Sequence, residues 1–289
     1  AWSGDADELF RLGIINERLD RPSLSLEQYG AFQSYLESRL AGSGIRVGDL
    51  VITRSLDEMN EQIKAGAVDA LIEGVMPTLK LQRQTGQLDI RLLVWRKGKR
   101  KYHTVFFTRH ESRIQQIKDL GGKTIAFESA RSTSAYDIPR AALMEAGLRV
   151  AAKEGSQSSM PGDSNLVRFV FAGSELNQAY WVHANRVDAG AFNNGDWDRV
   201  PDSIRSDLRV FHRTPQVLRW LFSFARSIDP QVRRSIEDVL VTMHRDPEGQ
   251  AALQAASGIA RMERLTNEDR TNLDYWEAAL SRLEAGTAQ

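Results

Sequence analysis

Cysteine is missing from this sequence of 289 residues. Its absence excludes disulfide bonds, cysteine nucleophiles and metal sites built on thiolates. Long apolar runs are missing too, since no stretch approaches the roughly 20 residues that a membrane-spanning helix needs. The first residues, AWSGDADELF, are not a charged-then-apolar leader, and either a processed secreted protein or a shortened chain would begin in this way. Composition therefore leaves the location open.

A net charge is also lacking, because Lys plus Arg and Asp plus Glu both number 38. Without a net positive charge or a basic tract, the protein has no electrostatic attraction for nucleic acid, and binding to a membrane surface is not expected. The hydrophobic share of 42% and the charged share of 26% are ordinary for a globular protein. The length is enough for two lobes or one large domain with a substantial core.

The signatures of common enzyme sites are not found either. None of the five histidines stands four residues from another or in an H-E-x-x-H frame, so a zinc site is not expected. G-x-S-x-G, P-loop and G-x-G-x-x-G motifs do not occur. We therefore expect no catalytic residues, no metal and no cofactor, and an enzyme is the weakest hypothesis.

What the sequence does contain is an alternation of short apolar strands and amphipathic helices. Strands are predicted within residues 9–17, 48–54 and 68–74, and helices within 25–44 and 55–67. This order is typical of an α/β protein whose sheet is mainly parallel and covered by helices.

The middle of the chain repeats this order. Strands are predicted within residues 101–109, 123–129, 166–173 and 187–195, and helices within 114–122, 134–148 and 174–186. KAGAVDALIEG and HANRVDAGAFNNG share Val-Asp-Ala before a strand that ends in Gly, which indicates two related lobes. Asp69 and Asp188 of these segments are expected to bound helix-to-strand turns.

The remaining segments are predicted to form a loop, strands and further helices. Residues 152–165 are polar with Gly and Pro and predict a surface loop. Residues 206–228 resemble strands, and helices follow. The amphipathic segment 273–286 is expected to pack as a terminal helix on the first lobe.

Hydroxyl residues gather where the strand TIAF gives way to a helix, namely Ser129, Ser132, Thr133 and Ser134. A helix N-terminus leaves backbone N–H groups unpaired and carries partial positive charge. Hydroxyl groups add donors there without adding negative charge, so together they suit an oxyanion, with Arg131 as an available cation. Capping of the helix by one hydroxyl is the commoner explanation on these residues alone.

The central part of the chain resembles the phosphate/phosphite/phosphonate-binding proteins, which are substrate-binding components of ABC transporters with the type II periplasmic binding fold. The resemblance is carried by the stretch KYHTVFFTRHESRIQQIKDLGGKTIAFESARSTSAYDIPRAALMEAGL. The matching features are Tyr102, Arg109, DLGGK, TIAFES, the run from Ser132 to Tyr136, and Pro139. The resemblance continues through most of the chain and weakens toward the C-terminus.

This resemblance implies a two-lobed binding protein with a ligand cleft at a two-strand hinge. Lobe 1 would comprise residues 1–101 plus 210–289, and lobe 2 residues 102–209. Hydroxyl and amide groups of Ser132, Thr133 and Ser134 would hold an oxyanion, and Tyr102 would line the cleft. Asn194, after a strand, is a further contact candidate, although a turn-forming role is as simple.

The implied function is capture of a small oxyanion or organophosphorus ligand and its delivery to an ABC permease. The protein would be a periplasmic or extracytoplasmic monomer with its leader removed. A sensing domain of a membrane-bound signalling protein, with a sensor kinase as partner, is the alternative on the same fold.

Several residues depart from the family pattern. Glu175 stands where a His is common, Arg131 replaces a small residue, and the return strand has Trp220 where an acid is usual. EGVMPT replaces a first-lobe loop that is commonly Gly-Pro-aromatic. A carboxylate facing an anion is costly unless paired, and an Arg131–Glu175 pair would offset it. We therefore expect an altered pocket, for another oxyanion, a larger organophosphorus compound or a ligand with a cationic group, and Trp220 either packs or lines it.

Overall fold

The computed structural model describes residues 8–154 and 163–287. The chain divides into two compact units. Unit 1 is Ala1–Lys101 with Leu218–Asp274, and unit 2 is Tyr102–Val217 with Tyr275–Gln289. Most of the loop predicted at 152–165 lies outside the described residues.

The division differs from the expected lobes at two places. The return to unit 1 lies at Leu218 rather than at 210, because the preceding strand belongs to the sheet of unit 2. The end of the terminal helix belongs to unit 2 rather than to the first lobe. There Tyr275 donates from its hydroxyl to Glu145 at 2.9 Å, and Trp276 donates from Nε1 to the Gln216 carbonyl at 3.0 Å.

Unit 1 begins with a β/α series and is completed by the returning chain. Its elements are β1 (Glu8–Phe10), β2 (Leu12–Ile15), α1 (Leu24–Leu40), β3 (Ile45–Val47), β4 (Val51–Thr53), α2 (Leu56–Lys64), β5 (Ala70–Glu73), α3 (Val75–Thr85), β6 (Leu88–Val94), η1 (Arg96–Gly98), β15 (Trp220–Ala225), α8 (Pro230–Thr242), η4 (Met243–Arg245), α9 (Pro247–Ala255) and β16 (Met262–Arg264). The helix α10 (Asn267–Thr287) starts in unit 1 and ends in unit 2. The strands β7 (Lys101–Tyr102) and β14 (Val217–Leu218), where the chain leaves and re-enters unit 1, pair with each other.

The main sheet of unit 1 has six strands in the order β16-β6-β15-β5-β2-β4. β2 pairs in parallel with β4 and β5, whereas β15 pairs antiparallel with β5 and β6, and β16 antiparallel with β6. The returning strand β15 thus makes this sheet mixed rather than mainly parallel. A parallel strand needs a crossover, and β15 enters directly between two strands that run the other way.

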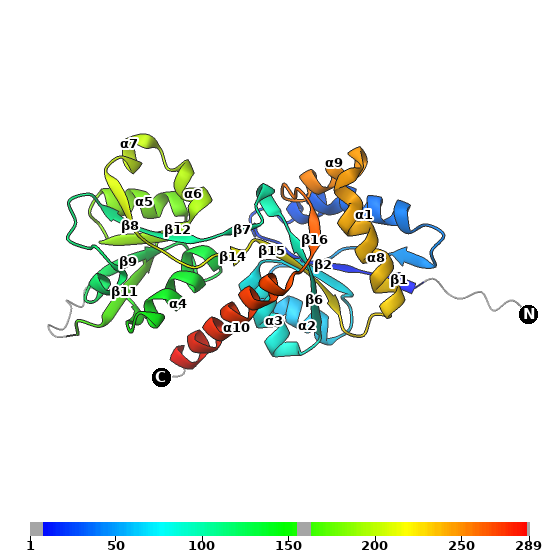
Figure 1. Ribbon diagram of the computed structural model, residues 1–289, viewed down its shortest axis with the longest axis horizontal. Helices are drawn as coiled ribbons and strands as arrows, with labels where there is room; N and C mark the ends of the chain where they lie inside the picture. Colours follow the sequence, from blue (N-terminus) through cyan, green and yellow to red (C-terminus); the bar gives the residue numbers. More distant parts are fainter. Residues whose placement is uncertain (1–7, 155–162, 288–289) are drawn as a thin grey trace, which may run out of the picture. The chain divides into compact units, whose positions relative to one another are not determined.

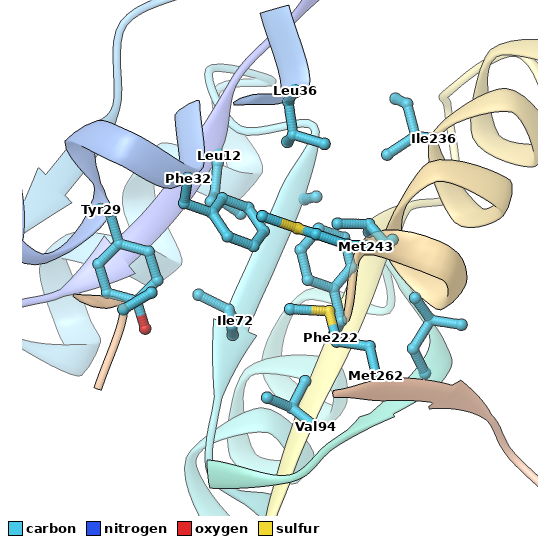
Figure 2. Packing of buried hydrophobic residues seen from close by; sticks show 14 of the residues in the cluster. Leu12, Tyr29, Phe32, Leu36, Ile72, Val94, Phe222, Ile236, Met243 and Met262 are labelled. Carbon is cyan, nitrogen blue, oxygen red and sulfur yellow. The ribbon is translucent and has the colours of Figure 1, made fainter. Parts of the chain in front are cut away.

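One face of this sheet packs against α1, α8 and α9 to form the main core of unit 1 (Figure 2). Phe32 and Leu36 of α1 meet Ile72, Phe222 and Met243, all of which are buried. Burial of a side chain of this size contributes about 1.5–3 kcal/mol to folding. A second cluster, with residues of β2, α2 and α3, covers the other face.

Unit 2 is built on the same kind of series. Its elements are β8 (Thr104–Arg109), η2 (Ile117–Leu120), β9 (Thr124–Phe127), the π-helical turn η3 (Thr133–Asp137), α4 (Ile138–Glu145), β10 (Arg149–Ala152), β11 (Leu166–Phe171), α5 (Glu175–His183), β12 (Ala189–Asn193), α6 (Asn194–Arg199), α7 (Asp202–Arg205) and β13 (Leu208–Arg213).

The sheet of unit 2 has the strand order β10-β11-β9-β12-β8-β13, parallel from β10 to β12 and antiparallel at β8 and β13. Alternate residues of β9 face opposite clusters. Ile125 and Phe127 pack with Leu143 of α4, and Ala126 packs with Ala179 of α5. The two helices therefore cover opposite faces of the sheet (Figure 1).

The two Val-Asp-Ala segments occupy equivalent places. Asp69 accepts the Arg11 N–H at 2.8 Å, just before β2, and Asp188 accepts the Thr124 N–H at 2.9 Å, at the start of β9. Asp69 directly precedes β5, which pairs in parallel with β2. Asp188 directly precedes β12, which pairs in parallel with β9. The predicted relation between the two segments is thus present in the hydrogen bonds as well as in the sequence.

Candidate ligand-binding site

The carboxyl ends of β9, β11 and β12 are neighbouring strand ends in the sheet of unit 2, and a helical segment follows each of them. Ligands of open α/β sheets bind at this edge. After β9 comes a segment, residues 128–137, that we call the elbow. Ser174 begins α5 after β11, and Asn193 begins α6 after β12.

Ser132 acts as the helix cap of the elbow. Its side chain accepts the Ala135 N–H at 3.1 Å, and its own N–H donates to the Ser129 carbonyl at 3.2 Å. A π-helical turn follows and continues into α4 with Pro139 in the first turn, where a missing N–H costs nothing. The capping role weighed in the sequence analysis is therefore taken by Ser132.

Thr133 and Ser134 keep hydrogen-bond capacity. Among the described residues, the Thr133 hydroxyl has no hydrogen-bond partner. The Ser134 hydroxyl accepts from Asn193 Nδ2 at the long distance of 3.5 Å, which leaves its own hydrogen free to donate. Both side chains are half-buried at the start of a helical segment, where the first backbone N–H groups have no intrahelical partner. This arrangement can hold an oxyanion.

Asn193 and Asn194 hold the neighbouring segments together. Asn193 Oδ1 accepts the Asp196 N–H at 2.9 Å and so caps α6. Asn194 Oδ1 accepts the His103 N–H at 3.0 Å, and its own N–H donates to the His103 carbonyl at 2.9 Å. The Asn194 side chain is therefore used to fix the approach to β8, and its contact with a ligand stays a prediction.

Glu175, the first residue of α5, interacts with a second acid that sequence analysis did not single out. Burial is the main cause that raises the pKa of Glu175 to about 7, followed by the negative charge of Glu128. The charge of Asp196 acts in the same direction. The groups that raise this pKa are acidic, and the expected pair with Arg131 stays a prediction.

Arg131 and Tyr102 differ in exposure. Arg131 is exposed within the elbow, two residues before Thr133. Tyr102 is only 7% exposed and belongs to β7. Their contacts with a ligand remain predictions.

Trp220 in unit 1 is a packing residue. It is 6% exposed and belongs to the main hydrophobic cluster. The Arg96 guanidinium covers its ring, with Cζ 4.0 Å from the centroid, and Glu17 holds Arg96 at 2.6 Å. Of the two roles considered, the structure shows packing, and ligand contact by Trp220 stays a prediction.

The segment EGVMPT is the end of β5 and the first turn of α3 rather than a loop. Gly74 is the helix cap, with no side chain to bond the first N–H groups. Trp220 lies beside this cap, and a Cβ added at Gly74 would be in ordinary van der Waals contact with its Nε1, at 3.4 Å. A short helix joined directly to a strand is hard to recognise here because Pro77 and Gly74 both suggest a turn.

Three further residues of these surfaces were not expected from the sequence, namely Glu128, Asp196 and Arg96. Glu128 directly follows an apolar strand, and this position at the end of a strand was the one sequence feature that could have marked it as a site residue. The described residues contain no group of three or more His, Asp or Glu side chains arranged to hold a metal ion. Within the same residues, the helices are too short or too polar to cross a membrane.

The chain matches a family model along residues 20–270, which is most of its length. The model is described as "ABC transporter, phosphonate, periplasmic substrate-binding protein".

Solved structures agree with this family. XAC2383 from Xanthomonas citri is 28% identical, with 96% of this chain and 99% of that chain covered. Its TM-score is 0.85 in the form bound to chloride ion and 0.84 in the form bound to ATP. PhnD1 from Prochlorococcus marinus, in complex with methylphosphonate, is 15% identical at a TM-score of 0.63, with 96% and 99% covered. The aliphatic sulphonate binding protein SsuA from Escherichia coli is 16% identical at 0.56, with 96% and 93% covered.

These last two likenesses concern the fold, and they confirm the predicted type II periplasmic binding fold. The family model identifies the functional class, which is the periplasmic binding of a solute for an ABC transporter. The chain belongs to the periplasmic phosphonate-binding proteins of ABC transporters.

Proposed function

We propose that the elbow of unit 2 binds the oxyanion of a small phosphonate-like or phosphate-ester ligand. Thr133 and Ser134 donate from their hydroxyl groups, and the unpaired N–H groups of the first helical turn add further donors. Ser132 caps the turn, and the exposed Arg131 and the buried Tyr102 are further ligand contacts. No bond in the ligand is made or broken, so the protein is a carrier and not an enzyme.

One observation carries this proposal: the hydroxyl groups of Thr133 and Ser134 are not consumed by capping. Ser132 alone bonds the turn, at 3.1 Å from the Ala135 nitrogen. A run of hydroxyls needed only for helix capping would leave the second and third exchangeable for other small residues. The relative bound to ATP and the fold neighbour bound to methylphosphonate support a phosphoryl or phosphonyl group as the recognised part.

The finer aspects of transport belong to the same proposal. The partner is the permease of an ABC transporter, the chain works outside the cytoplasm after removal of a leader, and it works as a monomer. A sensor kinase is the partner in the alternative hypothesis, and no feature of residues 8–154 or 163–287 favours it over the permease.

Titration followed by tryptophan fluorescence or calorimetry tests the ligand class. The panel is phosphate, phosphite, methylphosphonate, 2-aminoethylphosphonate, methanesulfonate, sulfate and ATP. We expect saturable binding of at least one phosphonate or phosphate ester. If no member of the panel binds to the wild-type protein, the proposal is wrong.

Variants of the elbow test its location. We expect Thr133→Ala combined with Ser134→Ala to weaken binding about 10- to 100-fold, because each hydrogen bond to a charged group contributes roughly 1.5–3 kcal/mol, partly replaced by water. Ser55→Ala is the matched control, since Ser55 caps α2 in unit 1 as Ser132 caps the elbow. Unchanged affinity in the elbow variant would place the ligand elsewhere.

A further inference from the structure

Unit 2 has a groove beside α5 that is separate from the elbow. The groove has a volume of about 290 Å³. Its lining residues, which define what we call the α5 groove, are Thr124, Lys153, Val170, Trp181, Arg186 and Val187. Thr124 is the first residue of β9, whereas the elbow follows the last residue of this strand. The α5 groove is therefore not part of the proposed oxyanion site.

One part of the α5 groove is apolar. Val187 belongs to the hydrophobic cluster that α5 forms with the sheet, and Val170 and Trp181 pack against this cluster. Trp181 is only half-buried, so its ring keeps accessible surface after this packing. Ligand sites are typically lined by such apolar and aromatic side chains, with a few polar groups that fix the orientation of the ligand.

The ring of Trp181 differs from two other tryptophan rings of the protein. The Arg96 guanidinium covers Trp220, with Cζ 4.0 Å from the centroid, and the Arg261 guanidinium covers Trp95 at 5.3 Å. Within residues 8–154 and 163–287, no guanidinium or aromatic ring stacks on Trp181. Its accessible surface is therefore available to a flat group of a ligand.

Two cations border the α5 groove. Lys153 and Arg186 are exposed, and neither side chain forms an ion pair or a hydrogen bond with another described residue. Their backbones are fixed, because the Lys153 N–H donates to the Phe169 carbonyl at 2.9 Å and the Arg186 N–H to the Trp181 carbonyl at 2.8 Å. The fold thus holds the bases of both side chains beside the apolar part.

A third cation, Arg168, lies on the same face of the sheet. It is opposite Thr124 in the pairing of β11 with β9. Val167 packs on the α4 side and Val170 on the α5 side, so the alternation of side chains along β11 places Arg168 on the α5 side. Arg168 is half-buried, and its side chain has no partner in the part of the chain that the structure describes.

These cations leave an excess of positive charge on this face of unit 2. The carboxylate of Asp188 is nearby, where it accepts the Thr124 N–H at 2.9 Å, and it offsets one charge of the three. The chain as a whole has equal numbers of acidic and basic residues, so the excess is local. Cations gathered at a concave surface repel one another and attract an anion.

We propose that the α5 groove binds a small anion that carries one flat ring, such as an aryl phosphate or an aryl carboxylate. The ring lies on Trp181 and Val170, and Lys153 and Arg186 bind the charged group. The volume is near the lower end of the range of ligand sites, roughly 300–1,000 Å³, which favours a single ring over a larger molecule. This site does not depend on the proposed function of the elbow.

Titration with phenyl phosphate, followed by NMR of the tryptophan indole N–H groups, tests the position of the ligand. Trp181→Phe identifies the Trp181 signal, because this signal is missing from its spectrum while an aromatic ring is kept in the packing. We expect phenyl phosphate to shift the Trp181 signal in a saturable way. Methyl phosphate, which has no ring, should bind there roughly tenfold more weakly. No shift of this signal, or equal affinity for both probes, would overturn the inference.

Charge variants test the anion. Lys153→Gln combined with Arg186→Gln should weaken the binding of phenyl phosphate about tenfold at low salt, because two ion pairs with the ligand are lost. Both side chains are exposed and lack partners among the described residues, so the fold should be unaffected. Arg46→Gln combined with Lys99→Gln is the matched control, since it removes the same two charges from exposed positions of unit 1. Equal losses in the two variants would overturn the inference, because the attraction would then be general.

The elbow variant separates this inference from the proposed function. Thr133→Ala combined with Ser134→Ala should leave the titration of the Trp181 signal unchanged. If it abolishes the shift while the Lys153 and Arg186 variant does not, phenyl phosphate binds at the elbow, so the proposed function is supported and the inference fails. If the Trp181 signal titrates but no phosphonate or phosphate ester binds at the elbow, the inference stands and the proposed function fails. A poly-glutamate peptide that shifts the Trp181 signal when phenyl phosphate does not would assign the α5 groove to a protein partner and overturn the inference.

Discussion

Asp69 in unit 1 and Asp188 in unit 2 accept the backbone N–H at the start of a neighbouring parallel strand, from Arg11 at 2.8 Å and from Thr124 at 2.9 Å. Arg11 also forms an ion pair with Asp69, with Nε at 3.0 Å, whereas Thr124 has no charged side chain to do so. The hydrogen bond from the backbone N–H is common to both units, whereas the additional ion pair is found in unit 1. The shared strand arrangement therefore depends on the backbone and the two aspartates.

The units differ where their strands end. Unit 1 places Ile15 and Leu56 in its hydrophobic cluster, and unit 2 places Glu128 and Glu175 at the corresponding positions. Gly74 caps α3 without a side chain, while Asn193 caps α6 with its own. A framework shared by two units therefore accommodates apolar residues at this edge in unit 1 and polar residues in unit 2.

The largest expected effect tests the shared framework in the core. Phe222 of β15 lies opposite Ile72, and Phe106 of β8 lies opposite Ala191, at corresponding positions of the two sheets. Both rings are fully buried. Replacing either with Ala should lower the free energy of unfolding by about 3–5 kcal/mol, because a cavity replaces the ring. Urea unfolding with hydrogen exchange resolved by unit measures this loss, and a cost below about 1 kcal/mol in one unit would break the equivalence.

An intermediate effect tests the acidic edge of unit 2. The pKa of Glu175 is raised from its unfolded value near 4.5 to about 7, so the native state binds more protons between these values. Wild-type stability should therefore fall as pH rises through this window, and the loss should be complete above it. Glu175→Gln removes this loss and should raise the unfolding free energy by about 1–2 kcal/mol at pH 8 and have little effect at pH 4.

Thermal unfolding at several pH values measures this difference, with Glu61→Gln as the exposed control. A stabilisation that does not depend on pH would contradict the raised pKa of Glu175.

The smallest expected effect concerns the helix caps, which are alike in the two units. Ser55 accepts the Glu58 N–H at 3.1 Å, and Ser174 accepts the Asn177 N–H at 3.1 Å. Ser55→Ala and Ser174→Ala should each destabilise the protein by about 1 kcal/mol. Chemical unfolding measures both, and clearly unequal costs would show that the edge next to the acids alters the cap.

Much of the local structure could be predicted from residue patterns. The alternation of strands and helices and the elbow at Ser132 depend on contacts within a few residues. The repeated Val-Asp-Ala segments are visible as a short motif, although their aspartates bond residues 58 and 64 positions away. The helix α3 was missed because Gly74 and Pro77 favour a turn when they are considered alone. The place of β13 was missed because its pairing with β8 joins residues about a hundred positions apart, and no local pattern encodes that choice.

The site was predictable in one part and not in another. Ser132, Thr133 and Ser134 could be identified because a helix start is a local feature with known electrostatics. Glu128 could not be identified from the sequence. Its environment arises because the pairing of β9 with β11 brings Gly173, two residues before Glu175, beside it. The aromatic Trp220 was ambiguous until the Arg96 guanidinium was found over its ring.

By itself, the sequence determined the fold class, the family resemblance and the position of a donor-rich elbow, because these depend on periodicity, short motifs and helix-end chemistry. Only the tertiary structure decided which hydroxyl is used as a cap, that Trp220 is packed, and that the negative charge of Glu128 acts on Glu175. These outcomes depend on which strands lie next to each other. Burial and neighbouring charge, which set the pKa of Glu175, arise only when distant segments come together.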